Sequence, residues 1–477
     1  MTEKIKQVLN DKVWARWTAL ILVASMMFFG YMFVDVLSPL QELCQTRLGW
    51  DAEDFGYYAG AEYMLNVFGF LILAGIILDR MGIRFTGTLS ASMMVAGASI
   101  KAFAVSSLFA GSGLEAWLDS WWVEMPGSAK LAAFGFMIFG CGCEMAGITV
   151  SKAIAKWFDG KEMALAMGVE MAIARLGVFS VLSISPGISN WYGEADPSIV
   201  APVVFCTLLL IIGLIGYIAF DLMDTRLDRQ TGADKIAVDP EEEFKLSDVG
   251  NLFRSPLFWI IALLCVLYYS AIFPFQRFGT NMLQCNLHIS DVAAADLLRW
   301  FPIGALILTP FLGYFLDKIG KGATMLIIGS LLLIGCHLVF ALVLPDHPRT
   351  WIALTTIIVL GISFALVPAA LWPSVPKVMD KRFLGSAYSL IFWVQNIGLF
   401  GVPILFGKIL RASNKGVDPS AYDYTNPMLM FAGFGVLALI FAIILKVVNT
   451  RNHYGLEDPN IKTSAITEAA EAEAIDQ

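Results

Sequence analysis

Charged residues are scarce in this chain. Asp, Glu, Lys and Arg together make up 15% of its 477 residues, whereas soluble proteins average about 25%. Hydrophobic residues make up 57%, and the mean hydropathy is +0.70. A composition this apolar excludes an ordinary soluble protein and indicates an integral membrane protein.

Histidine is also rare. The four histidines, His288, His337, His347 and His453, show no metal-ligand or catalytic-triad spacing, and no phosphate-binding loop is visible. His337 stands alone in an apolar run, where we expect a packed, hydrogen-bonded side chain. The sequence therefore argues against an enzyme, and we expect no metal, no cofactor and no nucleic-acid partner.

Long polar segments are few, so the apolar runs dominate the chain. Runs of roughly 17 to 25 residues are long enough to cross a bilayer as helices. Twelve such runs, in two sets of six, predict an all-α integral membrane protein with two pseudo-symmetric six-helix bundles. They are Trp14–Leu40, Phe55–Leu78, Thr86–Phe109, Leu131–Ile154, Glu162–Ile184, Ile199–Phe220, Leu257–Phe275, Val292–Leu316, Ala323–Leu344, Trp351–Pro376, Gly385–Leu410 and Pro427–Val448.

The predicted domain boundaries follow from the polar interruptions. Residues 1–220 form the N-terminal bundle and residues 257–449 the C-terminal bundle. Residues 221–256, rich in both charge signs, are a cytoplasmic linker, and residues 450–477 are an acidic cytoplasmic tail. A short surface helix is expected at Lys245–Phe253.

Lys and Arg gather in the short loops on one side of the predicted bundle. In the predicted topology, that side also carries the linker and both termini, while the loops on the opposite side are mainly acidic. Basic loops face the cytoplasm, so we expect both termini there. We place this multi-pass protein in the inner (plasma) membrane of a bacterium, in contact with lipid and acting as a monomer.

Glu144 and Arg175 lie deep inside two consecutive apolar runs. Counted from their shared loop at roughly 1.5 Å per residue, both lie about 15 to 20 Å in, near the membrane midplane. An ionised group persists there mainly where it has a partner or lines a water-filled path. The two could form a structural ion pair, or could receive the ammonium and carboxylate of a zwitterion.

Three more residues in the N-terminal set are candidates. Asp35, beside Tyr31 in the first span, could bind an ammonium group or a proton, or could pair with a mobile base near the outer mouth. Glu170 lies five residues before Arg175, about 140° away around a helix, and could bind and release a proton during transport. Glu62 lies early in the second span, where we expect it to be solvated near the outer surface.

An internal repeat supports the two halves. The turn after the second span contains Asp79, Arg80 and Arg84, and the turn after the eighth contains Asp317, Lys318 and Lys321 at nearly the same spacing. Duplicated bundles are common in transporters. The acids and bases of both turns predict a gating latch that forms and breaks as the halves move, although a plain positive-inside loop remains the alternative.

This loop pattern resembles the signature of the major facilitator superfamily, and the resemblance extends from the first to the twelfth span. Longer strings are similar to those of its lysosomal dipeptide transporters. These strings are Gly142-Cys143-Glu144, Ala174-Arg175-Leu176-Gly177, Tyr268-Tyr269, Ala370-Leu371-Trp372-Pro373 and Gln395-Asn396-Ile397-Gly398.

The resemblance implies that Glu144 and Arg175 hold the two termini of a dipeptide, with facilitative rather than ion-driven transport. Glu170 departs from the family pattern as we interpret it, and Lys101, Asp296 and Arg299 add further charges in or near the membrane.

The second set of spans offers aromatic and amide side chains. An amide in hydrocarbon needs a hydrogen-bond partner, so Gln395 and Asn396 could bind peptide groups, and the aromatic residues could either pack or line the site. The predicted substrate-binding set is Tyr31, Asp35, Glu144, Arg175, Tyr268, Tyr269, Trp372, Gln395 and Asn396.

Three functions are therefore considered. The first is an alternating-access transporter of dipeptides or similar small zwitterions, working as a uniporter. The second is a proton-coupled transporter of amino acids or organic anions that uses Asp35 or Glu170. The third is a membrane sensor or scaffold without transport, against which stands the lack of a soluble signalling domain.

Overall fold

The structure is a computed structural model. It describes residues 8–159, 161–191, 193, 196–231, 246–379 and 384–459. Residues 232–245 of the predicted linker and the tail after residue 459 lie outside the described residues.

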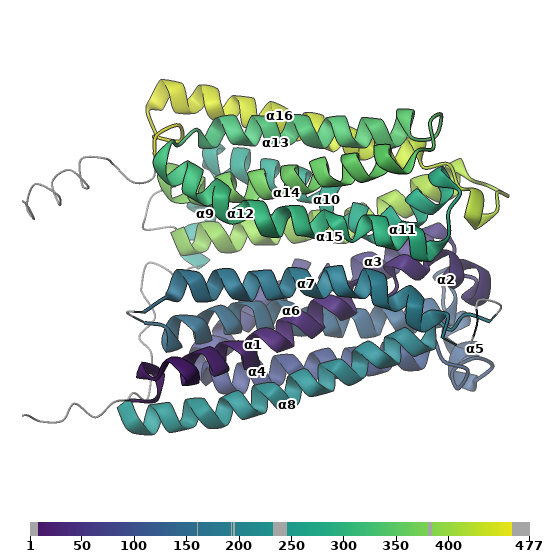
Figure 1. Ribbon diagram of the computed structural model, residues 1–477, viewed down its shortest axis with the longest axis horizontal. Helices are drawn as coiled ribbons and strands as arrows, with labels where there is room; N and C mark the ends of the chain where they lie inside the picture. The colour runs from purple at the N-terminus through teal and green to yellow at the C-terminus, as the bar shows by residue number, and fades with distance from the viewer. Residues whose placement is uncertain are drawn as a thin grey trace, which may run out of the picture.

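Helices account for nearly all of the described chain (Figure 1). The N-terminal helices are α1 (Val13–Val34), α2 (Gln41–Leu48), α3 (Ala52–Val67), α4 (Phe70–Ala104), α5 (Gly113–Asp119), α6 (Gly127–Trp157), α7 (Met163–Ser189) and α8 (Val200–Thr231). The C-terminal helices are α9 (Leu246–Phe253), α10 (Pro256–Leu287), α11 (Asp291–Leu298), α12 (Trp300–Lys318), α13 (Gly322–Leu338), α14 (Thr350–Val378), α15 (Leu384–Ser413) and α16 (Thr425–Asn452). A short π-helix, η3 (Val339–Val343), extends α13, and three 3-10 turns, η1 (Leu9–Asp11), η2 (Ser38–Leu40) and η5 (Pro419–Ala421), flank the long helices.

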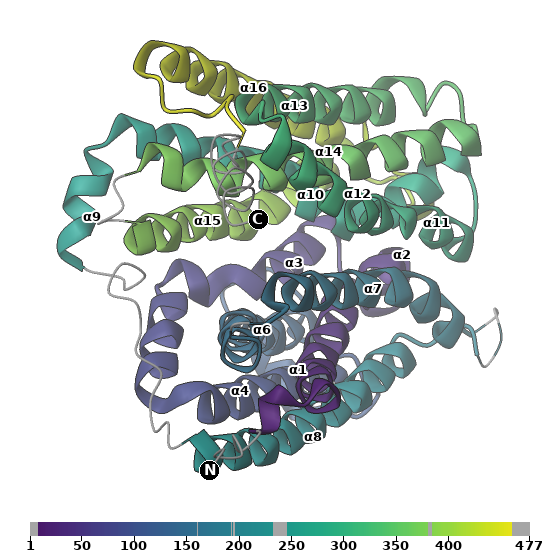
Figure 2. The same ribbon diagram turned by 60° about the vertical axis from the view of Figure 1, so that its left-hand side comes forward.

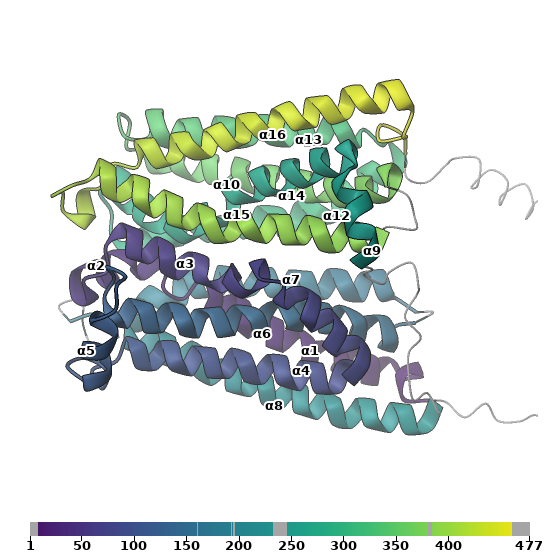
Figure 3. The ribbon, with the colours of Figure 1, turned by 180° about the vertical axis from the view of Figure 1, so that it is seen from behind.

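The long helices form two bundles that lie side by side (Figures 1 and 3). The N-terminal bundle contains α1, α3, α4, α6, α7 and α8, and the C-terminal bundle contains α10 and α12 to α16. The predicted surface helix is α9, which the structure describes from Leu246 to Phe253. The two-bundle architecture is the predicted fold.

The twelve predicted spans map onto these helices. Within the described residues, nine helices are long and apolar enough to cross a membrane, and the bent pair α3 and α4 gives up to ten. The 35-residue α4 contains two helical stretches, because Gly82 inside it has φ 76° and ψ 173°. The second of these stretches is the third span, and α11 with α12 supplies the eighth.

The second span is broken at its middle. The axes of α3 and α4 differ by 53°. The break falls at Phe68 and Gly69, and Gly69 adopts φ 92°, a conformation that glycine reaches without the steric penalty of a Cβ atom. Trp393 of α15 donates its indole N–H to the Val67 carbonyl oxygen at 2.8 Å, and so satisfies a backbone group freed by the break.

Both described ends of the chain lie at one end of the bundles (Figure 2). We name this the inner end, in keeping with the predicted orientation, and the opposite end, which carries α2, α5 and α11, the outer end (Figure 1). Between described residues, the side-chain hydrogen bonds and ion pairs that join the bundles lie toward the outer end or at the Trp393–Val67 contact. The bundles are therefore closed together on the outer side.

The tightest contact between the bundles runs along α3 and α15. A methyl group at Gly60 would overlap the Phe400 carbonyl oxygen, and one at Gly56 would overlap the Pro403 carbonyl oxygen. Two backbones can approach this closely only where neither carries a side chain between them, as in other membrane helix pairs. Beyond the break at Gly69, α4 bends away from this seam.

Candidate functional site

Glu144 and Arg175 lie near the middle of α6 and α7, as predicted. Both side chains are half-buried. Neither the carboxylate nor the guanidinium has a hydrogen bond or an ion pair with any residue that the structure describes. Two opposite charges at similar depth thus have no hydrogen-bond or ion-pair partner among the described residues.

The predicted structural ion pair between these residues is not formed. Their helices are not close neighbours, because α1 packs against both α6 and α7. Tyr31 of α1 lies within electrostatic range of Glu144, Arg175 and Glu170. The two charges therefore stand on different helices that both pack on α1, near the same Tyr31 side chain.

Arg175 faces the C-terminal bundle. Its guanidinium carbon lies 4.5 Å from the centre of the Phe364 ring of α14, a distance typical of a cation–π contact. Tyr269 of α10 is also within electrostatic range of Arg175. The Tyr269 ring stacks on Phe273 at 5.6 Å, and its hydroxyl accepts a hydrogen bond from Trp372 Nε1 at 3.2 Å.

Aromatic rings continue from this point toward the inner end. Trp372 stacks on Phe392 at 4.6 Å and lies 6.1 Å from the Tyr388 ring. These residues form an uncharged aromatic wall on α10, α14 and α15, which meets the other bundle where Phe364 contacts Arg175. The substrate-binding role of Tyr269 and Trp372 stays a prediction.

The other predicted C-terminal residues take different positions. Tyr268 is fully buried and hydrogen-bonded to Ser363 at 2.7 Å, so it packs the interior of its own bundle. Gln395 accepts a weak hydrogen bond from Cys265 at 3.4 Å. Asn396 donates to the Phe392 carbonyl oxygen at 2.9 Å, while its own side-chain oxygen is buried without a partner in the described chain.

Asp35 is fully buried and already paired. It forms an ion pair of 3.0 Å with Arg277 of α10, and Gln276 donates a second hydrogen bond to its other oxygen. Ser38 donates a third at 3.0 Å. The sequence left two roles open for Asp35, binding an ammonium group or a proton and pairing with a base near the outer mouth. The structure shows the pairing, which leaves the carboxylate unavailable to a ligand in this conformation.

Glu62 completes this group, and the expectation that it is solvated was wrong. Its side chain is 4% exposed, and Arg277 binds it with the other guanidinium nitrogen. Arg277 also donates to the Val34 carbonyl oxygen. Arg277 was not recognised from the sequence as the partner of either acid, although an arginine within an apolar run signals a buried counter-charge.

Asp296 and Arg299 form the expected local pair at 3.1 Å. Both also contact Ser183 of α7, at 3.4 Å and 2.7 Å. The local pair and a contact between the bundles therefore occur together at the outer end.

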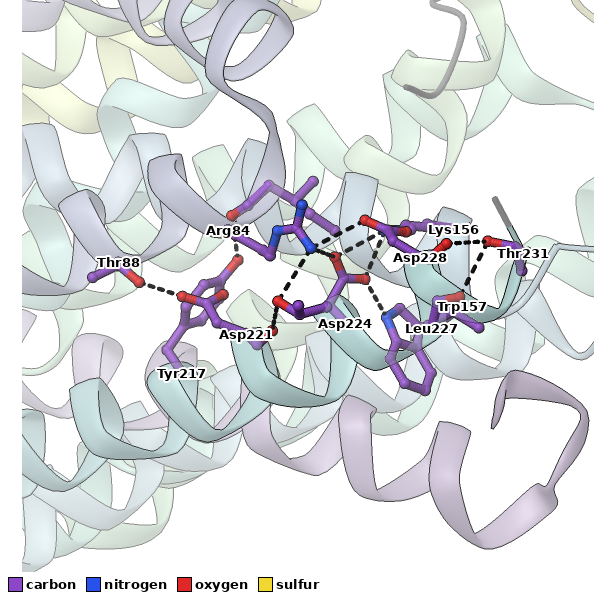
Figure 4. A network of polar contacts seen from close by, with 12 residues as sticks. Arg84, Thr88, Lys156, Trp157, Tyr217, Asp221, Asp224, Leu227, Asp228 and Thr231 are labelled. Carbon is purple, nitrogen blue, oxygen red and sulfur yellow. Dashed lines mark hydrogen bonds and ion pairs between the residues drawn. The ribbon is translucent and has the colours of Figure 1, made fainter. Parts of the chain in front are cut away.

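The first predicted gating turn makes contacts inside its own bundle. Asp79 pairs with Lys152 at 2.6 Å, and Arg84 pairs with Asp228 at 3.1 Å and Asp224 at 3.9 Å. Asp224, 1% exposed, also binds Lys156 at 2.8 Å and the indole N–H of Trp157 at 3.0 Å (Figure 4). This network ties α4, α6 and α8 together at the inner end.

The second gating turn behaves in a similar way. Lys321 lies 3.9 Å from Glu457, and Lys318 lies over the Tyr314 ring at 4.8 Å. The side chain of Asp317 is outside the described residues. The described contacts of both turns stay within their own bundles, so the gating role of Asp79, Arg80, Arg84, Asp317, Lys318 and Lys321 stays a prediction.

His337 is buried and hydrogen-bonded, as expected. Its Nε2 lies 3.1 Å from the Ala271 carbonyl oxygen, and its ring contacts Phe275. In the described part of the chain, no group of His, Cys, Asp and Glu side chains has the arrangement of a metal site.

Curated relatives share most of the chain. The human lysosomal dipeptide transporter MFSD1 is 26% identical over 448 residues, which cover 91% of this chain and 86% of the relative. Its zebrafish (Danio rerio) counterpart is 28% identical over 406 residues, which cover 83% of this chain and 80% of the relative. These relatives are transporters and not enzymes.

Solved structures share the fold at low sequence identity. The D323A mutant of the nucleoside transporter NupG aligns with a TM-score of 0.66 at 14% identity and covers 89% of this chain and 99% of NupG. A D-xylose-proton symporter aligns with a TM-score of 0.64 at 13% identity and covers 89% of this chain and 96% of the symporter. The profile of the Major Facilitator Superfamily matches residues 101–403 and 278–468. With this fold and this match over most of its length, the chain belongs to the Major Facilitator Superfamily.

Proposed function

We propose that this chain is an alternating-access transporter of dipeptides or similar small zwitterions and that it works as a uniporter. The observation that carries the proposal is that neither Glu144 nor Arg175, both at mid-membrane depth, has a hydrogen-bond or ion-pair partner among the described residues. A half-buried charge without a partner is unfavourable. A ligand with an ammonium group and a carboxylate would supply both missing partners.

The separation of the two charges supports a zwitterion longer than an amino acid. Glu144 and Arg175 stand on different helices that both pack against α1, and they form no ion pair with each other, so one ligand must carry its two charges on separated groups. The facing wall of Tyr269, Trp372 and Phe364 is uncharged and accommodates apolar side chains. MFSD1 proteins of 26% identity, which are named lysosomal dipeptide transporters, favour the same class of substrate.

Proton-coupled transport is the second candidate, and Glu170 favours it. This carboxylate is half-buried, lies within electrostatic range of Arg175 and has no hydrogen bond to a described residue. Asp35 fits proton coupling less well, because three donors already hold it. Uniport therefore remains our proposal, together with a monomeric state and cytoplasmic termini in a plasma membrane.

A thermal-shift screen of the purified protein tests the substrate class. Dipeptides, free amino acids, sugars and organic acids are compared, because a ligand at 100 times its Kd stabilises the native state by about 2.7 kcal/mol. We expect stabilisation by dipeptides and not by sugars or organic acids. Stabilisation by an organic acid alone would contradict the proposal.

Uptake into proteoliposomes then separates the two transport modes. We expect dipeptide uptake that stops at equal concentrations and is unchanged by a protonophore. Concentrative uptake that a protonophore abolishes, and that Glu170→Gln also abolishes, would establish proton coupling instead.

A further inference from the structure

Lys101 of α4 is a buried ammonium group that the proposed substrate site does not use. Its side chain is 0% exposed, and Nζ has no hydrogen-bond or ion-pair partner among the described residues. A buried charge without a counter-charge is rare and needs an explanation.

Three aromatic rings surround the ammonium. Nζ lies 4.2 Å from the ring centre of Phe33, 4.3 Å from that of Phe136 and 4.9 Å from that of Tyr58. These rings belong to α1, α6 and α3, so the cage lies wholly within the N-terminal bundle. Cation–π contacts hold the ammonium in place but give it no formal counter-charge.

The cage adjoins the buried ion pairs that close the outer side. The Phe136 ring also faces Arg277, whose guanidinium carbon is 5.4 Å from its centre. Glu62 binds Arg277 and lies within electrostatic range of Lys101. One aromatic ring therefore contacts two cations, and Glu62 is bonded to only one of them.

The distribution of these charges between the bundles is unequal. Asp35, Glu62 and Lys101 belong to the N-terminal bundle, and Arg277 belongs to the C-terminal bundle. When the bundles separate at the outer end, Arg277 must leave with its own bundle. Two carboxylates then remain in an apolar wall, and Lys101 is the cation already beside them.

We propose that Lys101 is the replacement counter-ion for Glu62, pairing with it when Arg277 withdraws and so permitting the outer side to open. The long, flexible stem of a lysine allows its ammonium to move toward a new partner. In the present conformation, Glu62 is paired with Arg277, and the ammonium of Lys101 is held by cation–π contacts with the aromatic cage. The inference rests on the alternating access of the proposed function but is independent of which solute is carried.

The test measures outer opening by electron-spin distance measurements in lipid nanodiscs. Spin labels are placed at Leu114 of α5 and Val417 of the outer loop before η5, which are 41% and 42% exposed. The wild-type protein should show a short and a long distance. In Lys101→Met the long-distance population should fall at least tenfold, whereas Lys101→Arg should retain it.

A double variant separates charge from packing. Glu62→Gln removes the carboxylate that needs a counter-ion, so Glu62→Gln combined with Lys101→Met should regain the long-distance population. Melting curves and gel filtration show whether each variant is folded. If Lys101→Met prevents folding, the comparison of Glu62→Gln with Glu62→Gln/Lys101→Met decides, because the proposal predicts equal opening in these two.

Three results would overturn the inference. The first is equal opening of folded Lys101→Met and wild type. The second is a double variant that stays closed while Glu62→Gln opens. Either result would exclude the role of Lys101 and leave alternating access intact. A wild-type protein whose outer distance never lengthens would overturn alternating access and the role of Lys101 together.

Discussion

Asp35 of α1 and Arg277 of α10 form an ion pair of 3.0 Å that joins the two bundles where both side chains are buried. A second pair between the bundles, Arg411 with Asp51 at 3.0 Å, lies at the outer surface, and its arginine is 53% exposed. The two pairs have similar geometry and very different surroundings. Their contributions to the closure of the outer side should therefore differ.

Loss of the buried pair should open the outer side. Removing one partner of a buried ion pair costs roughly 3 to 5 kcal/mol, so Arg277→Gln should shift the bundles toward outer opening in the spin-label measurement. Arg411→Gln is the matched control, because an exposed pair contributes only about 0.2 to 1 kcal/mol. An equal effect of the two substitutions would contradict the assignment of Arg277 to the closure.

The seam between α3 and α15 predicts a second way to open the outer side. Gly60→Ala places a methyl group against the Phe400 carbonyl oxygen, and overpacking of this kind costs roughly 1 to 3 kcal/mol. The closed arrangement should be destabilised and the long outer distance populated more. Gly401→Ala on α15 is the control, because a methyl group there meets nothing within 4 Å. No change in Gly60→Ala would show that the seam relaxes freely.

The substrate site should tolerate loss of its charges without loss of the fold. Glu144→Gln and Arg175→Ala remove groups that have no hydrogen-bond or ion-pair partner among the described residues, so each should change the free energy of unfolding by less than about 1 kcal/mol. Both should strongly reduce stabilisation by dipeptides. Glu124→Gln and Arg349→Ala, at exposed positions, should retain it. Unfolding of Glu144→Gln without ligand would favour a structural role.

The inner-end network predicts the opposite behaviour. Asp224 accepts hydrogen bonds from Lys156 and Trp157 and is 1% exposed. Hydrogen bonds to charged groups contribute about 1.5 to 3 kcal/mol each, so Asp224→Ala should lower the melting temperature clearly. The Asp79 side chain, which pairs with Lys152, is 43% exposed, so Asp79→Asn should change the melting temperature little. A melting temperature unaffected by Asp224→Ala would show that Asp228 replaces it.

The sequence located the spans and the depth of Glu144 and Arg175, because apolar run length and residue position along a helix determine both. It could not show that these two charges are apart, since that depends on α1 packing between α6 and α7. Glu62 and Arg277 were missed as partners for a related reason. They are 215 residues apart in sequence, and only the packing of α3 against the C-terminal bundle brings them together.

The break in the second span was also beyond sequence reasoning. Phe55–Leu78 reads as one continuous apolar run, and a glycine such as Gly69 is common in membrane helices without any break. The bend becomes necessary only where α3 must follow α15 and α4 must leave it.

Binding of one dipeptide and its blocked forms to three proteins tests the central claim most directly. Alanyl-alanine, its N-acetyl form and its C-terminal amide are titrated against wild type, Glu144→Gln and Arg175→Ala. An unpaired buried charge costs roughly 3 to 5 kcal/mol, so either block should weaken binding to wild type by about a hundredfold or more.

The pattern across the variants identifies which residue holds which terminus. The N-acetyl penalty should disappear in Glu144→Gln and persist in Arg175→Ala, and the amide penalty should do the reverse. Equal affinity of the wild-type protein for the free dipeptide and a doubly blocked one would contradict the account.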